Sequence, residues 1–99
     1  MKKLNDIVFL DSYPSIDLHG LDRDSARVAT NDFINDNYKM GNEIFVIVHG
    51  IGTGILRKEV CNTLEKNKKV LEYKTDYFNN GCTIVRIKIE GWRLVIFLC

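Results

Sequence analysis

Two short stretches decide the fold of this chain: "IDLHG" at Ile16–Gly20 and "VIVHGIGTGILR" at Val46–Arg57. In each, an apolar run ends at a His-Gly pair, and the second continues with glycine at alternate positions before a helical pattern begins. A short run rich in isoleucine, valine and leucine is typical of a buried strand. Both stretches therefore predict a strand that ends at a histidine.

The rest of the chain predicts two helices and two further strands. Asp22 can cap a first helix, with Ala26, Ala29, Phe33 and Ile34 on its inner side, and Gly41 ends it. Apolar residues at every fourth position predict a second helix over about 54–67. We expect a third strand at 70–77, a hairpin turn at Asn79–Cys82, and a half-buried fourth strand at 83–89.

The order of the predicted elements is β-α-β-α-β-β, which indicates an α/β fold. A strand-helix-strand unit closes with a right-handed crossover and makes its two strands parallel. We predict a two-layer sandwich with a mixed four-stranded sheet, formed by residues 15–89. Residues 1–14 are predicted as an N-terminal extension. Residues 90–99 are predicted as a C-terminal extension, in which Trp92–Leu98 could add an edge strand.

Length and composition restrict the class of protein. The chain has 99 residues, enough for one small domain, and 45% are hydrophobic and 27% charged. The formal net charge is only +1, so any nucleic-acid contact must use a local basic patch. The three cysteines form no CxxC pair, and no segment resembles a signal peptide or membrane span. These features predict a cytoplasmic protein with reduced cysteines and no membrane partner.

The two His-Gly pairs predict a functional site at one edge of the sheet. If the first two strands are parallel neighbours, His19 and His49 emerge at the same edge, where α/β folds bind ligands. Asp17 lies two residues before His19 and is expected on the same face as that histidine. A histidine at a strand end is more often structural than catalytic, but the convergence of three polar side chains favours a site. Histidine can accept and donate protons near neutral pH.

The glycine-rich loop predicts a site for an anion. At Gly50, Gly52 and Gly54 no Cβ atom keeps a ligand away from the backbone N–H groups, and the second helix begins just beyond. Arg57 and Lys58 would add positive charge in the first helical turn. Lysines 66, 68 and 69 could extend these two cations into a basic patch, or simply form a solvated helix face.

Other readings of the loop are weaker. No Gly-Lys-Ser/Thr follows, so it is not a P-loop, and Ile55 replaces the last glycine of a dinucleotide-binding motif. Glu72 nevertheless lies at about the spacing of a ribose-binding acid, so a nucleotide site stays open. The histidines lack the spacing of a zinc site. A hard cation such as Mg²⁺ could bind Asp17 together with phosphate oxygens.

These motifs together resemble the Smr family, the small MutS-related domains. The resemblance rests on "IDLHG" followed by a helix, on "VHGIGTGILR" at Val48–Arg57, and on "NGCTIV" at Asn80–Val85. It covers about Ser15–Lys88. The fold it implies is similar to the C-terminal domain of a bacterial translation initiation factor. The activity it implies is nucleic-acid binding, with endonuclease cleavage of DNA or RNA by several members and action on ribosomes by some.

The resemblance also assigns roles to residues. Asp17 and His19 match the Asp-x-His motif linked to cleavage, and His49, Gly50, Gly52 and Gly54 match the loop linked to substrate binding. The main hypothesis is therefore an endonuclease that holds a backbone phosphate in the loop. Two alternatives stay open: a non-catalytic module that docks on RNA or the ribosome, and a binder of nucleotides or small phosphates. The metal requirement and the oligomeric state are left open.

Overall fold

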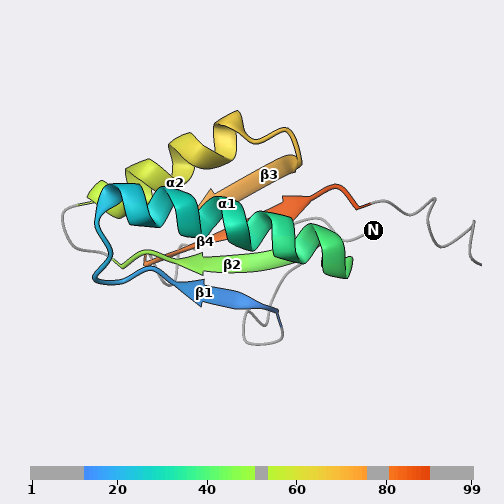
Figure 1. Ribbon diagram of the computed structural model, residues 1–99, viewed down its shortest axis with the longest axis horizontal. Helices are drawn as coiled ribbons and strands as arrows, with labels where there is room; N and C mark the ends of the chain where they lie inside the picture. Colours follow the sequence, from blue (N-terminus) through green and yellow to red (C-terminus); the bar gives the residue numbers. More distant parts are fainter. Residues whose placement is uncertain (1–12, 51–53, 76–80, 90–99) are drawn as a thin grey trace, which may run out of the picture.

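The computed structural model describes residues 13–50, 54–75 and 81–89. Within these ranges the chain forms four strands and two helices in the predicted order (Figure 1). The elements are β1 (Ser15–Asp17), α1 (Arg23–Met40), β2 (Ile44–Val48), α2 (Ile55–Lys66), β3 (Val70–Thr75) and β4 (Cys82–Ile87). The predicted strand at Trp92–Leu98 lies outside the described residues, and the predicted domain limits stay a prediction.

The four strands form one mixed sheet in the order β1-β2-β4-β3. β1 and β2 are parallel, with Asp17 opposite Val48, whereas β4 is antiparallel to both β2 and β3. The prediction that the first two strands are parallel neighbours is confirmed. Their carboxyl ends therefore open at the same edge of the sheet (Figure 1).

Both helices cover one face of this sheet, which makes the fold a two-layer sandwich, as predicted (Figure 1). The core between the layers is mainly apolar. Phe45 meets Phe33 of α1 edge to face, with 5.2 Å between ring centroids. The buried core residues are Leu18, Ala26, Ile34, Phe45, Ile47, Val60, Leu64, Val85 and Ile87.

Two predictions about strand burial are wrong. β4 was expected to be half-buried, but Ile84 and Cys82, on the face away from the helices, are buried as well. The reason is that β4 is a central strand, and Ile84 packs there against Ile44 and Tyr13. β1 was expected to be a buried strand, but its first and last residues, Ser15 and Asp17, are exposed because it forms an edge of the sheet.

The helix ends follow from local sequence. The Asp22 carboxylate accepts a hydrogen bond from the Ser25 N–H at 2.7 Å and so caps α1, which ends just before Gly41. α2 begins after Gly54 and ends before Asn67. In the described ranges, neither helix is long and apolar enough to cross a membrane. Cys61 is a free thiol.

Candidate functional site at the ends of the parallel strands

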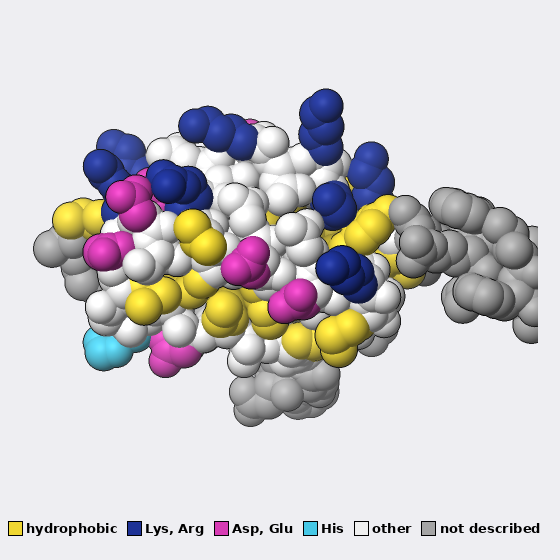
Figure 2. Space-filling model, viewed as in Figure 1, with side chains coloured by type: hydrophobic (Ala, Val, Ile, Leu, Met, Phe, Trp, Pro, Cys, Tyr) yellow, Lys and Arg dark blue, Asp and Glu magenta, His cyan; other side chains and the backbone are white. Residues whose placement is uncertain are grey.

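A tight turn after β1 presents His19 to solvent. The Asp17 carboxylate accepts a hydrogen bond from the His19 backbone N–H at 2.9 Å, and the Leu21 N–H donates to the Leu18 carbonyl at 3.0 Å. Gly20 has a φ of +87°, which a residue with a side chain rarely adopts. Figure 2 shows a histidine at the surface on the side where β1 and β2 end. The turn therefore leaves the His19 ring exposed.

His49 follows β2 and differs sharply from His19, because it is buried. Its Nδ1 lies 3.0 Å from the Gly50 carbonyl oxygen, and its Nε2 lies 2.8 Å from the Thr83 hydroxyl. A carbonyl only accepts, so Nδ1 carries the proton, and in the neutral ring that burial favours Nε2 accepts from Thr83. This assignment makes His49 a neutral ring that ties the end of β2 to β4.

Burial lowers the pKa of His49, because a charged ring would lose its hydration. The hydrogen bond to the Gly50 carbonyl opposes this effect, and the positive charge of Arg57 adds to it. His49 was predicted to bind substrate phosphate. Since both ring nitrogens already have protein partners, we expect the ring to hold the loop in place, and direct contact with a phosphate stays a prediction.

The backbone around the glycine-rich loop is held at both described ends. The N–H groups of His49 and Gly50 both donate to the Gly81 carbonyl, at 2.7 and 2.9 Å. At the other end Gly54 has a φ of +83°, and the first helical bond of α2 runs from the Lys58 N–H to the Gly54 carbonyl at 3.0 Å. Among the described residues no side chain caps α2, so its first N–H groups face outward with the positive end of the helix dipole.

These features surround one cavity of about 590 Å³. It joins five of the residues predicted for the site: His19, His49, Gly50, Gly54 and Arg57. The other lining residues come from the start of each helix and from the turn before α1: Leu21, Asp22, Arg23, Ile55 and Leu56. The prediction that both histidines share one crevice is thus matched by the structure, although the two rings have different environments.

Asp17 does not line this cavity. It pairs with Val48, and alternation along the strands places both on the sheet face away from the helices. In the described part of the chain, no hydrogen bond joins its carboxylate to the His19 ring. Asp17 therefore acts on His19 through the main chain, which differs from direct orientation of the imidazole.

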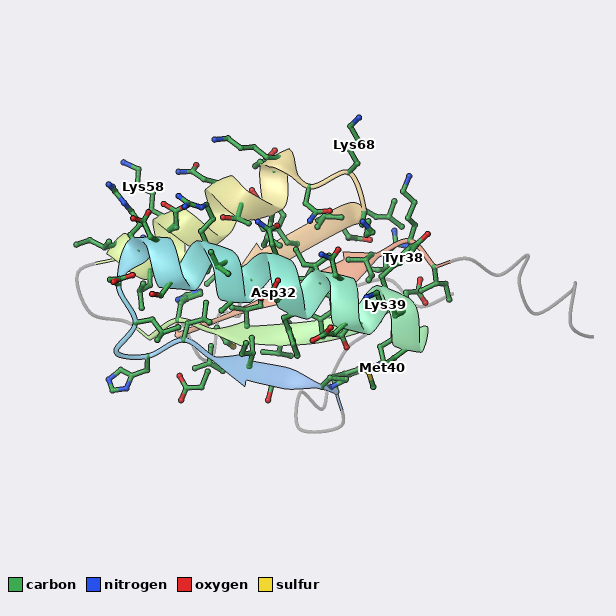
Figure 3. All side chains as sticks on the ribbon, in the orientation of Figure 1. Asp32, Tyr38, Lys39, Met40, Lys58 and Lys68 are labelled. Carbon is green, nitrogen blue, oxygen red and sulfur yellow. The ribbon has the colours of Figure 1, made fainter. Side chains whose placement is uncertain are left out.

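Positive charge is distributed differently from the predicted basic patch. Lys58 lies near the start of α2 and Lys68 near the opposite end (Figure 3), and neither lines the cavity. The ammonium group of Lys69 lies 5.2 Å from the centre of the Tyr38 ring. Among the described residues, the cations that line the cavity are Arg57 and Arg23, and Arg23 was not predicted from the sequence.

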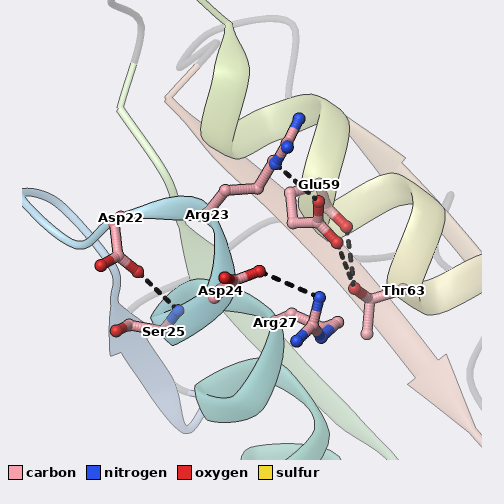
Figure 4. A network of polar contacts seen from close by, with 7 residues as sticks. All are labelled: Asp22, Arg23, Asp24, Ser25, Arg27, Glu59 and Thr63. Atoms are coloured by element: carbon pink, nitrogen blue, oxygen red, sulfur yellow. Dashed lines mark hydrogen bonds and ion pairs between the residues drawn. The ribbon is translucent and has the colours of Figure 1, made fainter.

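Arg23 links the cavity to the contact between the two helices (Figure 4). Its Nε lies 3.7 Å from the carboxylate of Glu59 on α2, whose side chain is only 14% exposed. Arg23 and Leu21 flank Asp22, and that helix cap was the one sequence signal that could have located them at the site.

Two further predictions concern ligands and can be compared with this geometry. Glu72 was considered as a ribose-binding acid, but β3 is the far edge strand and the Glu72 carboxylate accepts a hydrogen bond from Arg86 at 2.7 Å. The geometry therefore disfavours a dinucleotide site. No group of three or more His, Cys, Asp or Glu in the described ranges could hold a metal ion. Gly52 lies outside those ranges, and Mg²⁺ binding at Asp17 stays a prediction.

Fold and site together define a class: a small α/β domain with a polar cavity at the ends of two parallel strands. Comparison with known families makes the class specific. The family model described as the Smr domain matches residues 16–88, so this chain belongs to the Smr domain family.

The most similar relatives include proteins named endonuclease MutS2. The one from Clostridium perfringens is 36% identical over 76 residues, which is 77% of this chain but 10% of the relative. The one from Clostridium kluyveri is 37% identical over 73 residues, or 74% of this chain and 9% of the relative. This chain therefore spans about a tenth of the length of these relatives.

Two solved structures share the fold. The Smr domain of Thermus thermophilus MutS2 superposes with a TM-score of 0.73 at 24% identity, covering 76% of this chain and 98% of that one. YdaL, a stand-alone small MutS-related protein from Escherichia coli, also gives a TM-score of 0.73, at 25% identity, covering 80% of this chain and 71% of that one. The likeness to a translation-factor domain stays a prediction.

Proposed function

We propose that this Smr domain is a nucleic-acid endonuclease that cleaves a phosphodiester held in the cavity at the ends of β1 and β2. The observation that carries the proposal is that exposed His19, the start of α2 and Arg57 line the same cavity. Such a cavity can hold an anion and move a proton beside it. The names of the MutS2 relatives, which are called endonucleases, support the same activity.

The phosphate would be held by backbone and side chain together. The first N–H groups of α2 donate hydrogen bonds to its oxygens, and the guanidinium of Arg57 adds positive charge. As the transition state forms, negative charge grows on these oxygens and the same donors stabilise it. Neutral His49 keeps Gly50 in place through its Nδ1–H and thereby supports the start of the loop.

His19 would transfer the proton. As a base it takes a proton from the attacking water, or from the 2′-hydroxyl of RNA, while the oxygen bonds to phosphorus and the bond to the leaving oxygen breaks. As an acid it protonates that leaving oxygen. Asp17 is the positioning residue, because its carboxylate holds the His19 main chain.

Cleavage assays test this proposal directly. The purified chain is incubated with supercoiled plasmid and with long labelled RNA, each with Mg²⁺ and with chelator. His19→Ala should abolish cleavage and leave binding largely intact, because it removes only the proton carrier. Asp32→Ala, an exposed position on α1 (Figure 3), is the matched control and should cleave normally. Full cleavage by His19→Ala would refute the role given to His19.

One observation favours a second function, a non-catalytic module that docks on RNA or on the ribosome. The Asp17 carboxylate contacts the main chain of His19, and no Asp-His pair is joined through the ring in the described residues. This function predicts gel-shift binding to RNA without cleavage in any lane, by the wild type or by either variant. We further propose a cytoplasmic location, which the free thiol of Cys61 supports.

A further inference from the structure

We infer that the cavity takes an unstacked nucleotide, base included, so that the substrate is single-stranded or locally unpaired nucleic acid. The inference rests on the proposed function, because it assumes that the phosphate of that nucleotide binds at the start of α2. Its first support is size. About 590 Å³ lies within the range of roughly 300–1,000 Å³ that encloses a whole small molecule, and one phosphate group needs far less.

The second support is the apolar part of the cavity wall. Leu21 is 40% exposed and Ile55 is 56% exposed, and they come from two separate segments, the turn after β1 and the first residue of α2. Leu56 lines the same cavity and packs against the core. Exposed aliphatic side chains add nothing to the binding of a phosphate, but packing them against the flat apolar face of a base removes apolar surface from water, which is favourable.

The third support is how polar and apolar groups divide the cavity. The cations Arg23 and Arg57 and the N–H groups of α2 suit the phosphate, whereas Leu21 and Ile55 suit the base. None of the described lining residues is Phe, Tyr or Trp, so the base would rest against the aliphatic side chains of Leu21 and Ile55. In a duplex both faces of each base are already covered by its neighbours. The base can enter this cavity only after it leaves that stack, which makes the substrate unpaired at this point.

A pair of competitors with equal charge tests the inference. Labelled single-stranded DNA is bound to the wild-type chain and displaced either by the same unlabelled strand or by a strand of equal length in which every nucleotide is abasic. Both competitors present the same phosphates. We expect the abasic strand to compete on the order of tenfold more weakly, as for the loss of base contacts. A parallel series with RNA shows which nucleic acid binds better.

Variants locate the effect in the cavity. In the double variant Leu21→Ala, Ile55→Ala, the normal strand should compete only about twofold, or less, more strongly than the abasic strand. Binding of the abasic strand should change little. The matched control is Val28→Ala with Leu71→Ala, which truncates two aliphatic residues that are similarly exposed, 53% and 46%, but lie outside the cavity. This control should keep the full gap. Thermal unfolding checks that both double variants fold.

The outcomes separate the inference from the function on which it rests. Equal competition by the normal and abasic strands would overturn the inference and leave the phosphate site standing. A gap that the cavity variant does not reduce would also overturn it, because the base would then bind elsewhere. If neither strand binds the wild type, the proposed function fails and the inference fails with it.

Discussion

Replacing Thr83 by valine would remove one hydroxyl group beneath the candidate site. Thr83 is fully buried in β4, and its hydroxyl donates to His49 Nε2 over 2.8 Å. Valine has nearly the same shape, so the change tests the hydrogen bond and not the packing. In the variant Nε2 keeps its lone pair but has no donor. The other neutral tautomer would point a lone pair of Nδ1 at the Gly50 carbonyl, so neither tautomer satisfies both nitrogens.

The size of the effect follows from this geometry. A net hydrogen bond contributes about 1 kcal/mol, and leaving a buried polar group without a partner costs about 1–3 kcal/mol. We therefore expect the free energy of unfolding to fall by about 2 kcal/mol in Thr83→Val. For a domain of this size, that loss corresponds to a melting temperature about 8–16 °C lower.

Urea unfolding at neutral pH, followed by circular dichroism, measures this change. Thr30→Val is the matched control, because Thr30 is equally buried but its hydroxyl donates to the Ala26 carbonyl within the same helix. That carbonyl keeps its helical partner in the variant, so the control should lose less than about 0.5 kcal/mol. If Thr83→Val is as stable as the wild type, or if both variants lose the same amount, His49 is not held as described.

Three further predictions concern pH and helix ends. Because burial lowers the pKa of His49 in the folded chain, this histidine binds a proton more readily in the unfolded chain. The free energy of unfolding should therefore fall as pH drops below about 6.5. An NMR titration in which His49 protonates above that pH would contradict this prediction. Asp22→Ala should lower the melting temperature at neutral pH, whereas Asp22→Asn, which keeps an acceptor for Ser25, should not. Since that hydrogen bond lowers the pKa of Asp22, the stabilisation linked to the ionised carboxylate is present above its ordinary pKa and is lost as pH falls through the lowered value. The protonated carboxyl still offers its carbonyl oxygen, so the difference between Asp22→Ala and wild type should shrink in strong acid. Gly54→Ala should lower the free energy of unfolding by about 1 kcal/mol through its positive φ alone, because the atom nearest to the added Cβ, Arg57 Nη2, is at an ordinary contact distance of 3.7 Å. Asparagine tolerates a positive φ better, so Gly54→Asn should lower it less. Equal losses for the two variants in urea unfolding would refute the conformational explanation.

The two hydrogen bonds of the His49 ring also bear on how the proposed nuclease works. His19 is exposed, whereas His49 is buried and neutral. The two His-Gly pairs look alike in the sequence but perform different tasks in this structure. In the proposed mechanism the first pair presents a proton carrier, whereas the second holds Gly50, at the start of the glycine-rich loop, near β4.

Much of the fold could be predicted from local patterns. Asp22 and Gly41 mark the ends of α1, and the stripe of Leu56, Val60 and Leu64 marks the inner face of α2, because caps and helical periodicity involve residues close in sequence. The strand-helix-strand order then made β1 and β2 parallel and placed both histidines at one edge of the sheet.

The sequence by itself thus determined the described elements, their order, and the meeting of His19, His49, Gly50 and Gly54 at one cavity. Only the tertiary structure decided that β4 lies beside β2, that Thr83 therefore reaches the His49 ring from 34 positions away, and that Leu21 and Arg23 line the cavity. The physical reason is how far apart in the sequence the interacting residues lie. Caps, turns and periodicity depend on neighbours along the chain, whereas hydrogen-bond partners and cavity walls depend on which distant strands and helices pack together.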